Sequence, residues 1–181
     1  MPETIARLRP MTAADIPAVI TIGRRIWQEH YVPIIGQEQV DYMTSQRFTA
    51  DYLSRYLPTA ADNVPSAVRW LDLLEQKSEG TAEVVGYCSY ALGDRPGELK
   101  LEQLYLLPDL HGHGLGGLML QHIEQHARTL GLSTLWLTVN KNNAISIRVY
   151  RKRGFSVRES AIFNIGSGFV MDDYVMEKQL G

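Results

Sequence analysis

The sequence predicts one mixed α/β domain that spans residues 1–181. Three neighbouring apolar runs between residues 67 and 107, joined by short polar turns, predict an antiparallel meander. Apolar residues then recur at helical spacing from 115 to 130, and another strand-like run follows. A strand, a helix and a strand inside an otherwise antiparallel sheet give a mixed sheet. A chain of this length is sufficient for one domain with a sizeable core.

The first part of the chain predicts one strand and two helices. Residues 5–9 can form a short first strand that Pro10 ends. Asp15 caps a helix whose apolar face extends to Tyr31, and Pro33 and Gly36 break it. A second helix is predicted over 37–48. Residues 57–65 contain two prolines among small and polar residues, which indicates a loop.

The remaining elements follow from apolar runs and from the turn residues between them. Turns around Gly80 and at 94–97 separate strands 67–74, 84–91 and 99–107, and Pro108 ends the third. Gly131 closes the helix that begins near Gly114. Strand 133–139, helix 144–152 and strands 155–165 and 169–178 complete the order βααβββαβαββ.

Composition narrows the classes of partner. The chain is 45% hydrophobic and 21% charged, with a net charge of -2, so it offers no broad attraction to nucleic acid or to an anionic membrane. Cys88 is the one cysteine and lies in an apolar run, which predicts a small buried side chain. Residues 1–10 lack the apolar core of a signal peptide, and no apolar run reaches about 18 residues. We therefore expect a cytoplasmic protein.

A glycine-rich segment carries the chemical signal. His111-Gly112-His113-Gly114-Leu115-Gly116-Gly117 lies between a predicted strand and a predicted helix. Glycines let backbone N–H groups approach an anion, and a helix start adds unpaired donors and a partial positive charge. A phosphate cradle and a plain tight turn both fit this segment by itself. The lysine of a P-loop and the acidic residue of a dinucleotide fingerprint are missing from the expected positions.

Two segments together resemble signatures of the GCN5-related N-acetyltransferase (GNAT) family. Residues 104–116, with an apolar strand, Pro108 and the glycine loop, are similar to its motif A. Asn143 before a short helix that carries Tyr150, followed by Gly154-Phe155, is similar to its second signature. The resemblance covers the chain from Ile5 to Leu180. His111 departs from the pattern, because the family usually has Gln or Arg there.

The resemblance implies a cofactor, a fold and roles for named residues. It implies the GNAT acyltransferase fold, with the sheet splayed between the fourth and fifth strands. The acetyl-CoA diphosphate is expected over the amides of Gly112, His113, Gly114, Leu115, Gly116 and Gly117, with His111 beside them. The pantetheine arm is expected to pair with the strand at Leu104 and Leu106, as an added β-strand does. Asn143 is expected to contact the cofactor, and Tyr150 to protonate the leaving thiolate. The alternative for Tyr150 is an aromatic side chain packed in the core.

The base and the acceptor site stay open. Glu102 lies on the cofactor strand and is a candidate base; the alternative is a solvent-exposed strand carboxylate. Some relatives place a glutamate twelve residues before the tyrosine, and that position here is Thr138. Glu29, Tyr31 and Asp173 are candidate acceptor residues, against the alternative of ordinary surface side chains. The C-terminal segment weakly resembles bacterial acetyltransferases that include polyamine enzymes.

These features give two hypotheses from different classes. The first is an N-acetyltransferase that transfers acetyl directly from acetyl-CoA to a primary amine, either a small polyamine-like amine or a peptide amine. The alternative is a non-catalytic acetyl-CoA-binding sensor or regulatory module. His122 and His126 are four residues apart, but the order of His and Glu differs from the zinc protease pattern, so we predict no metal site. Assembly into a homodimer stays open.

Overall fold

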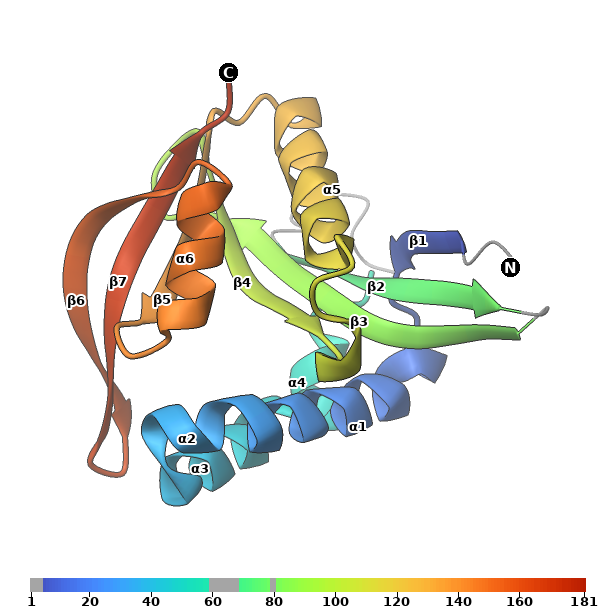
Figure 1. The fold of residues 1–181 in the computed structure, drawn as a ribbon, viewed down its shortest axis with the longest axis horizontal. Helices are drawn as coiled ribbons and strands as arrows, with labels where there is room; N and C mark the ends of the chain where they lie inside the picture. The colour runs from blue at the N-terminus through green and yellow to red at the C-terminus, as the bar shows by residue number, and fades with distance from the viewer. Residues whose placement is uncertain (1–4, 59–68, 79–80) are drawn as a thin grey trace. The chain divides into compact units, whose positions relative to one another are not determined.

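The structure is a computed structural model that describes residues 5–58, 69–78 and 81–181. Its first half contains β1 (Ile5–Pro10), η1 (Ala13–Asp15), α1 (Ile16–Ile26), η2 (Trp27–Tyr31), α2 (Val32–Ile35), α3 (Gln37–Arg47), α4 (Ala50–Ser54), β2 (Arg69–Ser78) and β3 (Thr81–Leu92). Its second half contains β4 (Glu98–Leu106), η3 (Pro108–Leu110), α5 (Leu115–Thr129), β5 (Thr134–Asn140), α6 (Ala144–Lys152), β6 (Ser156–Gly166) and β7 (Phe169–Gln179). Figure 1 shows these elements along the chain.

The strands confirm the predicted mixed sheet. Within the described residues they hydrogen-bond in the order β1-β2-β3-β4-β5-β7-β6. The pairs β1–β2, β2–β3, β5–β7 and β6–β7 are antiparallel, whereas β4–β5 is parallel. The parallel ladder runs from Glu98 opposite Thr134 to Leu101 opposite Leu137. Beyond that last pair, β4 continues to Leu106 and β5 to Asn140.

The chain forms two compact units that share two elements. The first unit comprises the described part of residues 1–91 together with 103–123. The second comprises residues 92–102 and 124–181. Both β4 and α5 therefore contribute residues to each unit.

The helical region of the first unit differs from the prediction. The expected helix to Tyr31 is α1 followed by a π-helical turn, η2, and then by α2. Pro33 is accepted in the first turn of α2, where its missing N–H costs nothing, and Gly36 ends that helix with a φ of 84°. The short helix α4 was not predicted; Thr49 caps it by accepting a hydrogen bond from Tyr52 N. The predicted loop at 57–65 and the turn at Gly80 lie largely outside the described residues.

A close packing contact explains one glycine in α1. A Cβ atom built on Gly23 would lie 2.2 Å from Cε1 of Phe48, which is 1% exposed. Beside this contact, the Trp27 ring stacks on Tyr31 with centroids 4.6 Å apart. Trp27 also meets the edge of Tyr105 from β4. The π-helical turn therefore directs two aromatic rings into the first unit.

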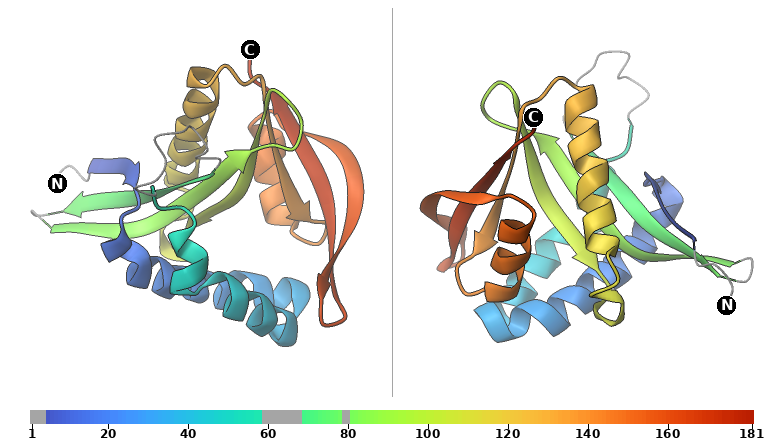
Figure 2. Two further views of the ribbon diagram at one scale, coloured as in Figure 1. Left: turned by 180° about the vertical axis from the view of Figure 1, so that it is seen from behind. Right: turned by 45° about the horizontal axis from the view of Figure 1, so that its top comes forward.

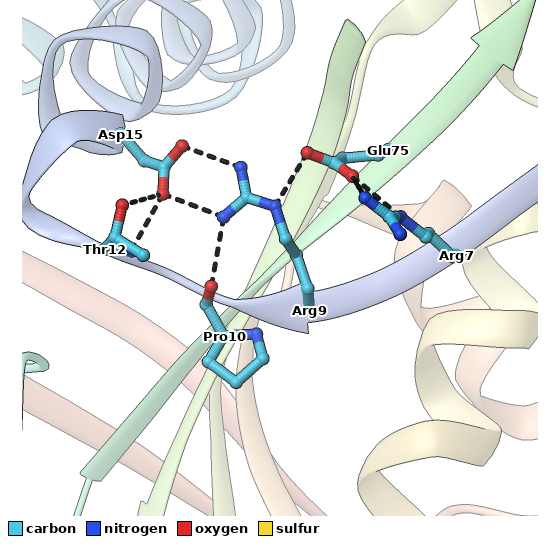
Figure 3. Close-up of polar contacts among 6 residues, drawn as sticks. All are labelled: Arg7, Arg9, Pro10, Thr12, Asp15 and Glu75. Carbon is cyan, nitrogen blue, oxygen red and sulfur yellow. Dashed lines mark hydrogen bonds and ion pairs between the residues drawn. The ribbon is translucent and has the colours of Figure 1, made fainter. Parts of the chain in front are cut away.

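An ion-pair network anchors β1 in the same unit (Figure 3). The buried Glu75 on β2 accepts from Arg7 Nε at 2.9 Å and from Arg9 Nε at 2.7 Å. The Arg9 guanidinium also binds both oxygens of Asp15, at 2.7 and 2.8 Å. Arg9 and Arg7 hold the pKa of Glu75 below its usual value, and Arg9 holds the pKa of Asp15 below its usual value. The network thereby connects the strand pair β1–β2 to the entry of α1.

The second unit places helices on one face of its strands. Lys178 on β7 binds Glu124 of α5 at 2.6 Å, and its side chain passes Gly154, just after α6. The views in Figure 2 show α6 beside β5 and β7. On the other face, Arg158 binds Glu98 and Glu177, while Trp136 lies between Lys100 and Arg158. Among the described residues, none of the helices has the length and apolar character needed to cross a membrane.

Candidate active site

Two glycines shape the loop between β4 and α5. Gly112 and Gly114 have φ values of 83° and 81°, in the left-handed region that side chains with a Cβ rarely adopt. A Cβ added to either would meet no atom within 4 Å. Backbone conformation, and not crowding within the protein, therefore requires glycine here. The open space beside both residues leaves room for a bound group to approach the backbone.

The start of α5 provides donors next to this loop. The amides of Gly117 and Leu118 donate to the carbonyl of Gly114, which closes the first turn. The first amides of a helix have no partner within the helix and carry a partial positive charge. Gly116 lies near β4, since its Cβ position is 4.0 Å from Cδ2 of Leu104. These features fit the diphosphate of acetyl-CoA, with its negative charge and its need for several backbone donors.

His111 has a contact that the sequence did not indicate. Its Nε2 lies 3.0 Å from the carbonyl oxygen of Leu106. Because a carbonyl only accepts, Nε2 carries the hydrogen and donates it. His111 thus fastens the loop to the end of β4.

The predicted cofactor residues of the first unit are therefore brought together. These residues are Leu104, Leu106, His111, Gly112, His113, Gly114, Leu115, Gly116 and Gly117. They form the end of β4, an exposed loop and the first turn of α5.

The second unit contains Asn143 and Tyr150. Asn143 is 3% exposed and caps α6, where its Oδ1 accepts from Ser146 N at 3.2 Å. Its side chain therefore fixes the helix that carries Tyr150. The Tyr150 ring is half-buried and meets the Phe155 ring at a centroid distance of 5.5 Å. This contact orients the ring and is compatible with either predicted role of Tyr150.

Two predicted acidic residues share one face of the second unit's strands. Glu102 follows Lys100 by two residues on β4, so it lies on the face of Trp136. Asp173 pairs in register with Asn140 and lies five residues before Lys178, hence on the face away from α5 and α6. Glu102 is half-buried, and Asp173 is 3% exposed. The interpretation of Asp173 as a solvated surface charge is therefore wrong.

The other predicted acceptor residues lie on η2 in the first unit. Glu29 is exposed and accepts from Arg25 Nε at 2.9 Å. The same guanidinium reaches Asp109 at 3.2 Å, just before the glycine loop. Tyr31 stacks on the buried Trp27. Arg25 therefore bridges the candidate acceptor turn and the segment that leads into the glycine loop.

The structure also gives other roles to residues noted in the sequence. Cys88 is fully buried, as predicted, and burial raises the pKa of its thiol. His122 binds Asp72 on β2 through Nε2 at 2.6 Å, a contact that no sequence spacing indicated. In the described part of the chain, no three His, Cys, Asp or Glu side chains are grouped to hold a metal ion.

Comparison with known proteins gives consistent matches. The family model described as Acetyltransferase (GNAT) family matches residues 35–155. An L-methionine sulfoximine/L-methionine sulfone acetyltransferase of Pseudomonas aeruginosa is 36% identical over 157 residues, which cover 84% of this chain and 81% of the relative. A spermidine N(1)-acetyltransferase of Thermoplasma acidophilum is 22% identical over 165 residues, 91% of this chain and 94% of that protein.

Two further matches add a partial relative and a fold neighbour. An uncharacterised N-acetyltransferase of Mycobacterium tuberculosis is 34% identical over 97 residues, 54% of this chain, and the match spans only 61% of that protein. The crystal structure of PaiA N-acetyltransferase from Thermoplasma acidophilum with coenzyme A has a TM-score of 0.76 at 20% identity. The match covers 97% of this chain and 99% of the PaiA chain. This last likeness shows the shared fold.

Proposed function

The chain belongs to the acetyltransferase (GNAT) family, and from this premise we propose that it transfers an acetyl group from acetyl-CoA to a primary amine. The observation that carries the proposal is the glycine loop, with two left-handed glycines, open space and a helix start beside β4. Acetyl-CoA supplies the activated acetyl thioester. A neighbour with the same fold was crystallised with coenzyme A.

We assign binding to the loop and to the end of β4. Amides of residues 112–116 bind the diphosphate, whereas the Gly117 amide, which was expected to join them, donates to the carbonyl of Gly114. Backbone groups at Leu104 and Leu106 align the pantetheine arm. Asn143 holds the start of α6 and contributes to cofactor binding. A rigid, preorganised loop lowers the entropy lost on binding.

Acetyl transfer requires the neutral, deprotonated form of the amine and a proton donor for the leaving thiolate. Glu102 is proposed to accept the proton of the amine. Tyr150 is proposed to donate its hydroxyl proton to the thiolate. Direct transfer of this kind needs no covalent bond to the protein.

The acceptor is proposed to be a cationic amine or amino acid that Glu29, Tyr31 and Asp173 help to bind. Support comes from two relatives, one named as an acetyltransferase of spermidine and the other as an acetyltransferase of methionine derivatives. Spermidine and these methionine derivatives each carry a primary amine. The acidic groups suit the positive charge of such a substrate.

Release of free thiol from acetyl-CoA with a panel of amines tests the proposal. The panel includes polyamines, amino acids and peptides, and we expect turnover with at least one. Coenzyme A binding without turnover across the panel would instead support a binding module without catalysis.

Gly114→Asp places a carboxylate at the expected diphosphate and should abolish coenzyme A binding in calorimetry. Near-native affinity in that variant would refute the loop assignment.

A further inference from the structure

The carboxylate of Asp72 joins three elements of the first unit. Its Oδ2 lies 2.6 Å from Nε2 of His122 on α5 and 2.6 Å from the hydroxyl of Tyr90 on β3. Asp72, on β2, is 5% exposed and Tyr90 is 1% exposed. The His122 side chain is 35% exposed. His122 is therefore the member of this cluster that substitutions can probe with little disturbance of the core.

The protons of the cluster follow from its chemistry. Tyr90 donates its hydroxyl hydrogen to Asp72. When the Asp72 carboxylate is ionised, it only accepts hydrogen bonds, so His122 donates as well. Burial and the carboxylate of Asp72 raise the pKa of Tyr90, which remains a protonated donor. His122 must then carry a hydrogen on Nε2. Hydrogen bonds to a charged, buried acceptor are short and strong, as the 2.6 Å distances indicate.

His122 lies on the helix whose first turn forms part of the glycine loop site. It is seven residues beyond Leu115, about two helical turns from the start of α5. At the other end of the loop, His111 donates to the carbonyl of Leu106. The loop is thus held at both ends by histidine contacts, one to β4 and one through α5 to β2. Neither contact uses a loop amide.

We propose that His122 is a positioning residue for acetyl-CoA binding. Its bond to Asp72 fixes the first half of α5 on the strands, so the loop amides are in place before the cofactor arrives. Preorganisation of this kind raises affinity without any contact to the ligand. The inference rests on the cofactor role proposed for the loop. A purely structural pair would instead affect stability alone.

A pair of substitutions separates these roles. In His122→Gln the amide nitrogen reaches the place of Nε2 and keeps the donor to Asp72. In His122→Asn the amide stops at the place of Nδ1, too short for that contact. We expect the Asn variant to bind coenzyme A about twofold to thirtyfold more weakly in calorimetry, the range for residues that act through a network. The Gln variant should bind like the wild type.

Two further measurements make the test specific. Amide hydrogen exchange in residues 112–118, measured without cofactor, should be faster in the Asn variant than in the Gln variant. When acetyl-CoA is varied at a fixed concentration of a working amine, kcat should be unchanged while KM for acetyl-CoA rises. Glu124→Gln is the matched control on α5, because it removes the negative charge that pairs with Lys178 at 2.6 Å. It should lower thermal stability and leave coenzyme A affinity unchanged.

The outcomes are distinguishable. Wild-type affinity in His122→Asn overturns the positioning role while the proposed function stands. Equal weakening by Glu124→Gln also overturns it, because general loosening of α5 would then be sufficient. A wild-type protein that binds no coenzyme A overturns the loop assignment and this inference together.

Discussion

Tyr150 carries a ring and a hydroxyl whose contributions one substitution can separate. Tyr150→Phe keeps the ring contact with Phe155 and removes the proposed donor. General acid catalysis contributes about 10²–10⁴-fold, so kcat should fall by that factor. KM for acetyl-CoA should change little, because the hydroxyl acts mainly in the transition state. Steady-state thiol release measures both constants.

Stability and a second tyrosine provide the controls for this prediction. Tyr52→Phe, on α4, should retain full activity. Thermal unfolding followed by circular dichroism shows whether a loss of activity in either variant accompanies a loss of stability. A kcat loss below about fivefold in Tyr150→Phe would contradict the catalytic role, because it falls below the usual range for a general acid.

We expect Glu102 to determine how the rate of acetyl transfer depends on pH. A base must be deprotonated to accept a proton, so activity falls at low pH when the base gains one. Glu102→Gln removes the carboxylate and should lower kcat/KM and remove this contribution to the acidic limb. The pH–rate profile of both proteins with the same amine checks it. An acidic limb of unchanged position and slope would assign the base elsewhere.

At the scale of elements, the Arg7–Arg9–Glu75 network predicts how β1 responds to acid. The pKa of Glu75 lies below its ordinary 4.5 and that of Asp15 below its ordinary 3.8. The folded state therefore favours the charged carboxyls, and their stabilisation is complete above those values. It is lost as the pH falls through the lowered folded-state pKa values.

Glu75→Gln measures this contribution. Hydrogen bonds to charged groups contribute about 1.5–3 kcal/mol each, so the variant should lose stability of that order at pH 7. Urea unfolding at pH 7 and at pH 3 should show a smaller difference at the lower pH. The exposed Glu83 on β3 offers a control, since Glu83→Gln should have little effect at either pH. A difference between wild type and Glu75→Gln that does not depend on pH would contradict the assignment.

The sequence predicted the strands and helices that prolines and glycines delimit. Helix α6 was predicted with its observed bounds because Asn143 caps it and Gly154 follows it. The π-helical turn η2 was not predictable, because its residues keep the apolar pattern of α1 and its distinct hydrogen bonding depends on tertiary packing. Helix α4 is five residues long, too short for a clear periodicity.

In the candidate site too, features set by adjacent residues were predicted, whereas contacts between residues far apart in the sequence were not. The glycine loop has a local signature, since positive φ values and a helix start require particular residues in sequence. The partners of His111 and His122 are a backbone carbonyl and a residue 50 positions away. Asp173 resembles a surface charge in sequence, yet its strand position buries it. Such contacts depend on register and packing, which residue spacing alone does not encode.

At the scale of the whole molecule, coenzyme A binding should stabilise the native state. A ligand that binds only the folded protein adds about 2.7 kcal/mol when its free concentration is about 100 times Kd. For a protein of this size, that corresponds to a rise in Tm of about 5–10 °C. The Kd from calorimetry sets the concentration, and differential scanning calorimetry measures the shift.

Gly114→Asp is the decisive comparison for this shift. Because its carboxylate should repel the diphosphate, Tm of the variant should be independent of coenzyme A. Its Tm without ligand should lie below that of the wild type, because Asp is strained at the φ of 81° that Gly114 adopts. An equal rise in both proteins would show that the ligand stabilises the fold from a site away from the loop. A rise confined to the wild type would show that coenzyme A stabilises the whole chain by binding at the seven residues from His111 to Gly117.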